Sequence, residues 1–120
     1  MVQTPRPGRA VRGSLTGRPI MAALDLLGRR WALRVLWELR AGPLGARALR
    51  DRCDAMSSSV LYQRLRELEA AGLVGRDGDR YELTALGRSL GTAIEPLDAW
   101  ARDWARSSSA EAPMPRADEA

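Results

Sequence analysis

A capped amphipathic helix is followed almost at once by two strand-like runs, and this combination is compatible with few folds. Ser57 is a favourable N-cap residue. Leu61, Leu65 and Leu68 repeat at the spacing that places side chains on one face of a helix. We therefore predict a helix over about residues 57–71 that packs on a core through these leucines.

The two strand-like runs lie close behind this helix and predict a hairpin. They cover residues 73–76 and 79–83, and Asp77-Gly78 lies between them. Asp-Gly is favoured in two-residue hairpin turns because both central residues take positive φ. We expect a hairpin over about residues 73–83, with Asp77 and Gly78 at its turn.

Three helical patterns precede the capped helix, and one follows the hairpin. Apolar residues at helical spacing indicate helices over about residues 19–27, 30–40 and 46–53. Thr84 is a cap for a long last helix. Pro96 removes one backbone donor from that helix and should kink it.

This order of elements predicts a fold that is mainly α with a small β-hairpin wing. A short helix, a tight turn and a capped helix form a helix-turn-helix, and a hairpin directly behind it is a wing. Residues 1–18 are rich in Gly, Pro and Arg without periodicity and are expected to form a disordered basic arm. With a disordered tail over 107–120, this leaves one winged helix-turn-helix domain over 19–106.

The composition restricts the chemistry that the chain can carry out. There is no histidine, and Cys53 is the single cysteine, which excludes an intramolecular disulfide and is expected to be a small buried hydrophobe. No phosphate-binding glycine loop, metal-spaced cluster or outstanding carboxylate pair is present, so we expect no enzyme, no metal and no cofactor. No apolar stretch would span a membrane and no signal peptide is recognised, so we expect a cytoplasmic protein without a membrane partner.

Arginine carries all of the basic side-chain charge, since none of the 19 basic residues is a lysine. The formal net charge is +4, and residues 1–18 contain four arginines and no acid. The rest of the predicted domain is nearly balanced. A basic excess suits a polyanion such as double-stranded DNA, but a DNA-binding face on the balanced domain must be local.

The side of the capped helix opposite the leucines carries side chains that suit DNA recognition. Ser59, Tyr62, Gln63 and Arg66 lie on this side, and Ser58 lies at its edge. Arg pairs bidentately with guanine and Gln with adenine, whereas Ser and Tyr contact phosphate or base edges. The alternative is a solvated face without a ligand, but this order of elements favours DNA contact.

Arginines on the neighbouring elements extend this candidate surface. Arg47 on the short helix suits a backbone phosphate, whereas Arg50 is better explained as a solvated side chain. Arg76 and Arg80 flank the hairpin turn, where Arg can enter a narrow minor groove. Charge balance with the neighbouring aspartates explains these two arginines equally well.

Large apolar residues near the end of the last helix indicate a partner. Leu97, Trp100 and Trp104 have little chain left to cover them, and contiguous exposed apolar surface marks an interface. We expect a homodimer through these residues. The alternative is that the first helix of the same chain covers them.

Several motifs together resemble the HxlR family of winged helix-turn-helix regulators. They are Leu27-Gly28-Arg29-Arg30-Trp31 with Leu36-Trp37-Glu38-Leu39, the run MSSSVLYQRLRELEAAGLV from Met56, and Tyr81-Glu82-Leu83-Thr84-Ala85-Leu86-Gly87. The resemblance covers about residues 18–104. It implies a three-helix core with a wing, dimerisation through the terminal helices, and a regulator, expected to be a repressor, that binds a pseudo-palindromic operator.

The chain departs from this family pattern at three places. Arg18 stands where many members carry a cysteine that some use for redox sensing. Gly45-Ala46 replaces an Arg-Phe pair, and the wing is a tight hairpin where the family usually has a longer one. We therefore expect that oxidants do not switch this protein through a thiol.

Other functions fit the same order of elements. One is a winged-helix module that binds protein and not DNA, and another is a ligand-responsive regulator of the MarR or PadR type. A small-molecule effector could occupy an apolar space near Trp31, Trp37 and Trp100, or these side chains could close that space completely.

Overall fold

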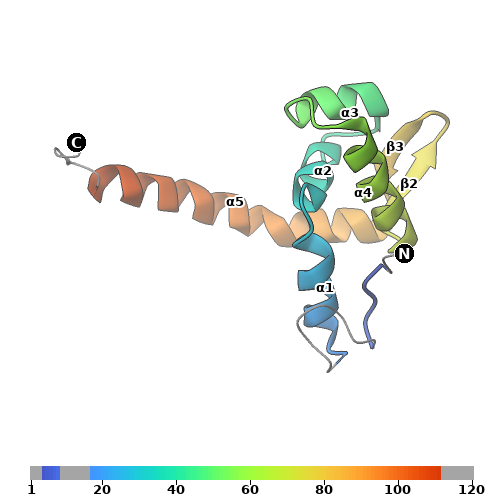
Figure 1. Cartoon of the computed structure of the whole chain (residues 1–120). Helices are drawn as coiled ribbons and strands as arrows, with labels where there is room; N and C mark the ends of the chain where they lie inside the picture. The colour runs from blue at the N-terminus through green and yellow to red at the C-terminus, as the bar shows by residue number, and fades with distance from the viewer. Residues whose placement is uncertain (1–3, 9–16, 112–120) are drawn as a thin grey trace. The chain divides into compact units, whose positions relative to one another are not determined.

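Five helices and three short strands make up the part of the chain that the structure describes. Figure 1 shows the helices and the hairpin of the last two strands. This computed structural model describes residues 4–8 and 17–111, the last three of them by backbone alone. The elements are α1 (Pro19–Leu27), α2 (Ala32–Leu39), β1 (Leu44–Gly45), α3 (Ala46–Arg52), α4 (Ser58–Ala70), β2 (Val74–Asp77), β3 (Arg80–Leu83) and α5 (Ala85–Glu111). The predicted mainly helical fold with a small wing is confirmed. One unit extends to Ser89 and a second begins at Leu90.

Helix α4 forms as its sequence predicts. The Ser57 hydroxyl accepts a hydrogen bond from the Val60 N–H at 3.2 Å, which satisfies one donor of the first turn. At the other end, Gly72 has a φ of +84°, and the Leu73 N–H donates to the Leu68 carbonyl at 2.9 Å. This is a Schellman ending, in which glycine reverses the chain and leads it directly into β2.

The core of the first unit lies between α2, α3, α4 and the sheet, which contact one another. Its fully buried side chains come from every one of these helices, and α4 supplies the predicted stripe. The most buried large side chains are Leu36, Leu39, Leu49, Leu61, Leu65, Leu68 and Val35, with Cys53 beside them.

The wing contains a third strand that the sequence did not predict. β1 pairs antiparallel with β3, which gives the strand order β1-β3-β2. Two residues are too short a segment for any periodic pattern to reveal. Because β1 directly precedes α3, this pairing fixes the start of the helix-turn-helix to the wing.

The predicted position of the hairpin turn is wrong by one residue. Asp77 pairs with Arg80 in the ladder, so the two central residues are Gly78 and Asp79. Of these two, Gly78 alone has a positive φ, of +65°. Glycine at the first central position is one of the two favoured hairpin arrangements, and the strand pattern alone does not separate it from Asp-Gly at the centre.

Helix α5 begins at the predicted cap and extends further than predicted. The Thr84 hydroxyl accepts a hydrogen bond from the Gly87 N–H at 3.0 Å and donates one to the Gly72 carbonyl at 2.7 Å. The helix continues to Glu111, past the expected end near residue 106, and it includes Pro96. The kink at Pro96 stays a prediction, and residues 112–120 of the expected tail lie outside the described residues.

Part of the predicted arm contacts the end of α4. Pro5 is buried, and Arg6 donates a hydrogen bond to the Ala70 carbonyl at 3.1 Å. The Gly8 N–H donates to the Gly17 carbonyl at 2.8 Å. The expectation of a disordered arm also covers residues 1–3 and 9–16, which lie outside the described residues.

Candidate nucleic-acid interface

The turn between α3 and α4 is held by Arg34, a residue of α2. Its guanidinium donates to the Arg52 carbonyl at 2.6 Å and to the Asp54 carboxylate at 3.2 Å. It also donates to Glu38 at 3.0 Å, and this hydrogen bond raises the pKa of Arg34 above its usual value. The last turn of α3 and the loop behind it are therefore fixed to α2 by one charged side chain.

The same turn contains two consecutive residues in the left-handed region. Asp54 and Ala55 each have a φ of +57°, although neither is glycine. Arg50 stabilises the turn from α3 by donating to the Met56 carbonyl at 3.1 Å, so Arg50 has a structural partner in place of a solvated position. Cys53 is fully buried beneath, and burial raises the pKa of its thiol.

The predicted reading face of α4 is exposed. Ser58, Ser59, Tyr62, Gln63 and Arg66 are all exposed, on the side away from the buried leucines. The Ser59 hydroxyl lies 3.1 Å from that of Ser57, so it also takes part in the helix cap. Among the residues that the structure describes, Gln63 and Arg66 form no hydrogen bond or ion pair. Their donors and acceptors are free to meet a ligand.

Two more predicted arginines lie near the start of α3. Arg80 pairs in the ladder with Gly45, the residue that directly precedes this helix, and Arg47 follows two positions later. Both side chains are exposed, and neither forms a hydrogen bond or ion pair within the described part of the chain. The pairing of β1 with β3 thus places one arginine from the wing beside one from the helix-turn-helix.

Arg76, the other predicted wing arginine, has partners within the first unit. Its Nε donates to Glu69 on α4 at 3.0 Å, and its guanidinium lies 4.8 Å from the centre of the Tyr81 ring. The hydrogen bond to Glu69 raises the pKa of Arg76. Arg76 therefore joins the wing to the last turns of α4, while its side chain remains 56% exposed.

A chain of nearly buried charges connects α4 to the end of α1. The Arg29 Nη2 lies 3.7 Å from Oδ2 of Asp25 on α1, and its Nη1 lies 3.2 Å from Oε2 of Glu67 on α4. Arg64 pairs with the other oxygen of Glu67 at 2.9 Å and donates to the Arg30 carbonyl at 2.6 Å. Arg64 is thus paired with an acid of its own helix.

The second unit carries the predicted dimer residues on one exposed face of α5. Leu97, Trp100 and Trp104 are 51%, 57% and 61% exposed. The two tryptophan rings stack, with centroids 5.4 Å apart and planes inclined by 24°. Within the described part of this unit no element covers the three side chains, and their spacing places them on one stripe of the helix.

These elements have the order of the winged helix-turn-helix class of DNA-binding proteins. A short helix and a turn fixed to α2 are followed by a capped second helix and a wing. A family profile described as HxlR-like helix-turn-helix matches residues 26–109. The HTH-type transcriptional regulator sll1512 of Synechocystis sp. is 33% identical over 100 residues, which cover 78% of this chain and 74% of that protein. The chain belongs to the HxlR-like helix-turn-helix family, a family of DNA-binding transcriptional regulators and not of enzymes.

Solved structures agree with this assignment. The crystal structure of quinone-bound YodB from Bacillus subtilis has a TM-score of 0.66 and 31% identity, covering 70% of this chain and 96% of that one. A possible HxlR family transcriptional factor from Thermoplasma volcanium has a TM-score of 0.64 and 27% identity, covering 70% of this chain and 82% of that one.

The described residues contain neither a metal-binding group nor a membrane-spanning helix. They contain no group of three or more histidine, cysteine or acidic side chains placed to hold a metal ion. No helix within 17–111 combines the length and the apolar character needed to cross a membrane.

The sequence missed the residues that hold the reading face in place. Arg34 and Arg29 contact partners that lie about 20 and 40 positions away, and no local pattern marks such a pair. Arg29 does fall within the motif that resembles the family, which was the one available signal. Identifying its role required the structure.

Proposed function

We propose that this protein is a homodimeric transcriptional repressor that binds a pseudo-palindromic operator. The observation that carries the proposal is the exposed face of α4, where Gln63 and Arg66 have no partner in the described residues. Arg64 on α4 and Arg76 on β2 are paired with Glu67 and Glu69, so the groups of Gln63 and Arg66 remain available for base edges.

The proposed docking places α4 in the major groove. Arg66 and Gln63 would contact base edges, and Ser58, Ser59 and Tyr62 would contact phosphates or base edges. Arg47 would contact a backbone phosphate. Arg80 on the wing would lie near the minor groove, while Arg76 would act on DNA chiefly through the direction it gives to the wing.

The dimer follows from the stripe of Leu97, Trp100 and Trp104. Apolar side chains that are more than half exposed cost free energy in water, and a second copy of the same stripe is a self-complementary cover. A two-fold dimer presents two copies of α4, and these match two half-sites of opposite direction. Bound across a promoter, such a dimer would exclude the polymerase, which is the basis for proposing repression.

The first test is a genomic binding profile followed by gel shifts on the recovered sites. Arg66→Ala and Gln63→Ala should each cost about 1–3 kcal/mol on the preferred site and relax base preference at one position. Arg47→Ala should weaken binding to all sequences alike. Arg102→Ala is the matched control, since this arginine is exposed on α5 and pairs with Asp98.

Salt titration and a promoter fusion complete the test. Protein binding to phosphates releases counterions from the DNA, so this binding should weaken steeply as the salt concentration rises. Deleting the gene should raise expression from the bound promoters. An Arg66→Ala protein with an unchanged binding profile would refute the proposed facing of α4, and reduced expression on deletion would refute repression.

A further inference from the structure

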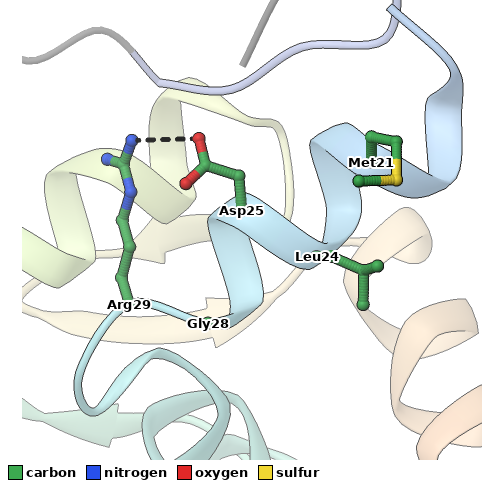
Figure 2. Close-up of a pocket in the computed structure, with 5 residues that line it drawn as sticks. All are labelled: Met21, Leu24, Asp25, Gly28 and Arg29. Carbon is green, nitrogen blue, oxygen red and sulfur yellow. Dashed lines mark ion pairs between the residues drawn. The ribbon is translucent and has the colours of Figure 1, made fainter. Parts of the chain in front are cut away.

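The second feature of the first unit that suits a ligand is a pocket on α1. It has a volume of about 270 Å³ and is lined by Met21, Leu24, Asp25, Gly28 and Arg29 (Figure 2). Trp31, Trp37 and Trp100, the place suggested by the sequence, do not line it. Figure 2 shows Asp25 and Arg29 facing each other at one end, with Met21 and Leu24 further along the helix.

The polar end of the pocket holds a carboxylate that accepts no hydrogen bond from the described residues. The Asp25 side chain is only 8% exposed, and its partner Arg29 lies 3.7 Å away, beyond hydrogen-bond distance. Within the described residues Asp25 has no other polar partner. A nearly buried carboxylate is stabilised by an N–H or O–H donor, so a ligand that supplies one is favoured here.

The charges on the wall determine the class of ligand. Asp25 and Arg29 cancel, so a net charge on the ligand would be attracted to one and repelled by the other. Met21 and Leu24 supply apolar contact for the rest of the molecule. The volume suits a small molecule, below the usual range for drug-sized ligands.

We propose that this pocket binds a small uncharged molecule with an apolar body and one hydroxyl or amide donor, which hydrogen-bonds to Asp25. Binding changes the ion pair between Asp25 and Arg29. Arg29 also pairs with Glu67 on α4, one residue from Arg66, so the pocket is connected to the reading face by two ion pairs. Occupancy therefore lowers the affinity for DNA. This last step rests on the proposed function, whereas the binding step does not.

Benzyl alcohol is the probe for binding, and its isomer anisole, which lacks the donor, is the matched control. Amide shifts in two-dimensional NMR spectra of the full chain report binding at each residue. Benzyl alcohol should saturate with a Kd in roughly the millimolar range and shift the amides of residues 21–29. Anisole and benzylammonium should each bind at least about fivefold more weakly.

Two tryptophan substitutions on adjacent positions of α1 locate the site. Met21→Trp fills the pocket and should weaken benzyl alcohol binding at least about tenfold. Ile20→Trp is the control, because Ile20 is 57% exposed and does not line the pocket. Leu24→Trp is a second filling variant if Met21→Trp does not fold. Equal binding of anisole, shifts that never saturate, or unchanged binding by both filling variants would overturn the proposal.

A gel shift with and without benzyl alcohol tests the connection to α4. Saturating probe should lower the operator affinity of the wild type at least about twofold and leave that of Met21→Trp unchanged. An unchanged or increased affinity in the wild type would refute the connection. A wild type that binds no DNA at all refutes the proposed function instead, and the NMR result then still decides the pocket.

Discussion

Gly87 lies where the first turn of α5 meets the backbone that leaves α4. A Cβ atom at this position would lie 2.1 Å from the Leu73 carbonyl oxygen and 3.3 Å from the Leu83 Cβ. The first distance is far shorter than a van der Waals contact, and the oxygen belongs to the backbone, so it cannot rotate away. The glycine of the Thr84-Ala85-Leu86-Gly87 motif is thus explained by close packing and not by backbone conformation.

Gly87→Ala should therefore destabilise the protein by about 2–4 kcal/mol, since the first turn of α5 must move to admit a methyl group. Gly75→Ala is the matched control, because its Cβ would meet Thr84 Cγ2 at an ordinary 3.6 Å. That variant should stay within about 0.5 kcal/mol of the wild type. Chemical denaturation of the three proteins measures the difference, and equal midpoints for both variants would contradict the packing argument.

Cys53 provides a prediction about oxidants. The side chain is fully buried, and burial raises the pKa of the thiol, which disfavours the reactive thiolate. Peroxide and diamide should therefore not release the protein from its operator, and Cys53→Ser should respond in the same way as the wild type. Gel shifts with each oxidant measure this. Release that disappears in Cys53→Ser would show that the thiol becomes accessible.

Single residues also show what a sequence can and cannot reveal. The exposed positions of Gln63 and Arg66 follow from the leucine stripe, because a helix that buries one face exposes the other. The roles of Arg34, Arg29 and Arg76 do not follow. Each depends on a partner from another element, and an arginine on a polar face looks the same whether it meets an acid, DNA or water.

At the scale of elements, the wing is joined to the reading helix by Arg76 and Glu69. β2 leaves α4 through the single glycine reversal at Gly72, and this ion pair connects the same two elements from the side. The sequence left Arg76 open between contact with DNA and charge balance. From its ion pair with Glu69 we propose that Arg76 sets the direction of the wing, while its contact with DNA stays a prediction.

Glu69→Gln separates these two roles of Arg76. If Arg76 directs the wing, Glu69→Gln and Arg76→Ala should both lower operator affinity, by about threefold to tenfold. If Arg76 contacts phosphate, Glu69→Gln frees the Arg76 side chain and operator affinity should rise, whereas Arg76→Ala should lower operator affinity. Affinities measured by fluorescence anisotropy at one fixed salt concentration decide between them, with Glu82→Gln on β3 as the control for loss of one acid.

Elements differ in how well the sequence predicted them. α4 has a cap, a buried stripe and a glycine ending that all indicate the same boundaries, and its bounds agree with the prediction to within a residue. α2 begins later than predicted because Trp31 takes a φ of +75° and ends the turn before it. β1 has two residues and exists through its partner strand alone, so no local signal preceded it.

The exposed stripe of α5 predicts how two copies of the chain associate. The wild type should sediment as a dimer at micromolar concentration, because association covers Leu97, Trp100 and Trp104. Trp104→Asp places a charge in that contact and should give a monomer with at least about tenfold weaker operator binding. Arg106→Asp, a charge change on the same helix in an ion pair with Asp103, is the control. A wild-type monomer that binds its operator tightly would exclude the dimer.

The stacked pair of Trp100 and Trp104 has a further consequence for how the protein can be observed. Two of the four tryptophans of the chain lie side by side on an exposed stripe, 5.4 Å apart. Indole emission shifts to shorter wavelength when the ring leaves water. The intrinsic fluorescence of the unlabelled chain is therefore a built-in optical reporter, whose spectrum should change with dilution as this stripe is covered or uncovered.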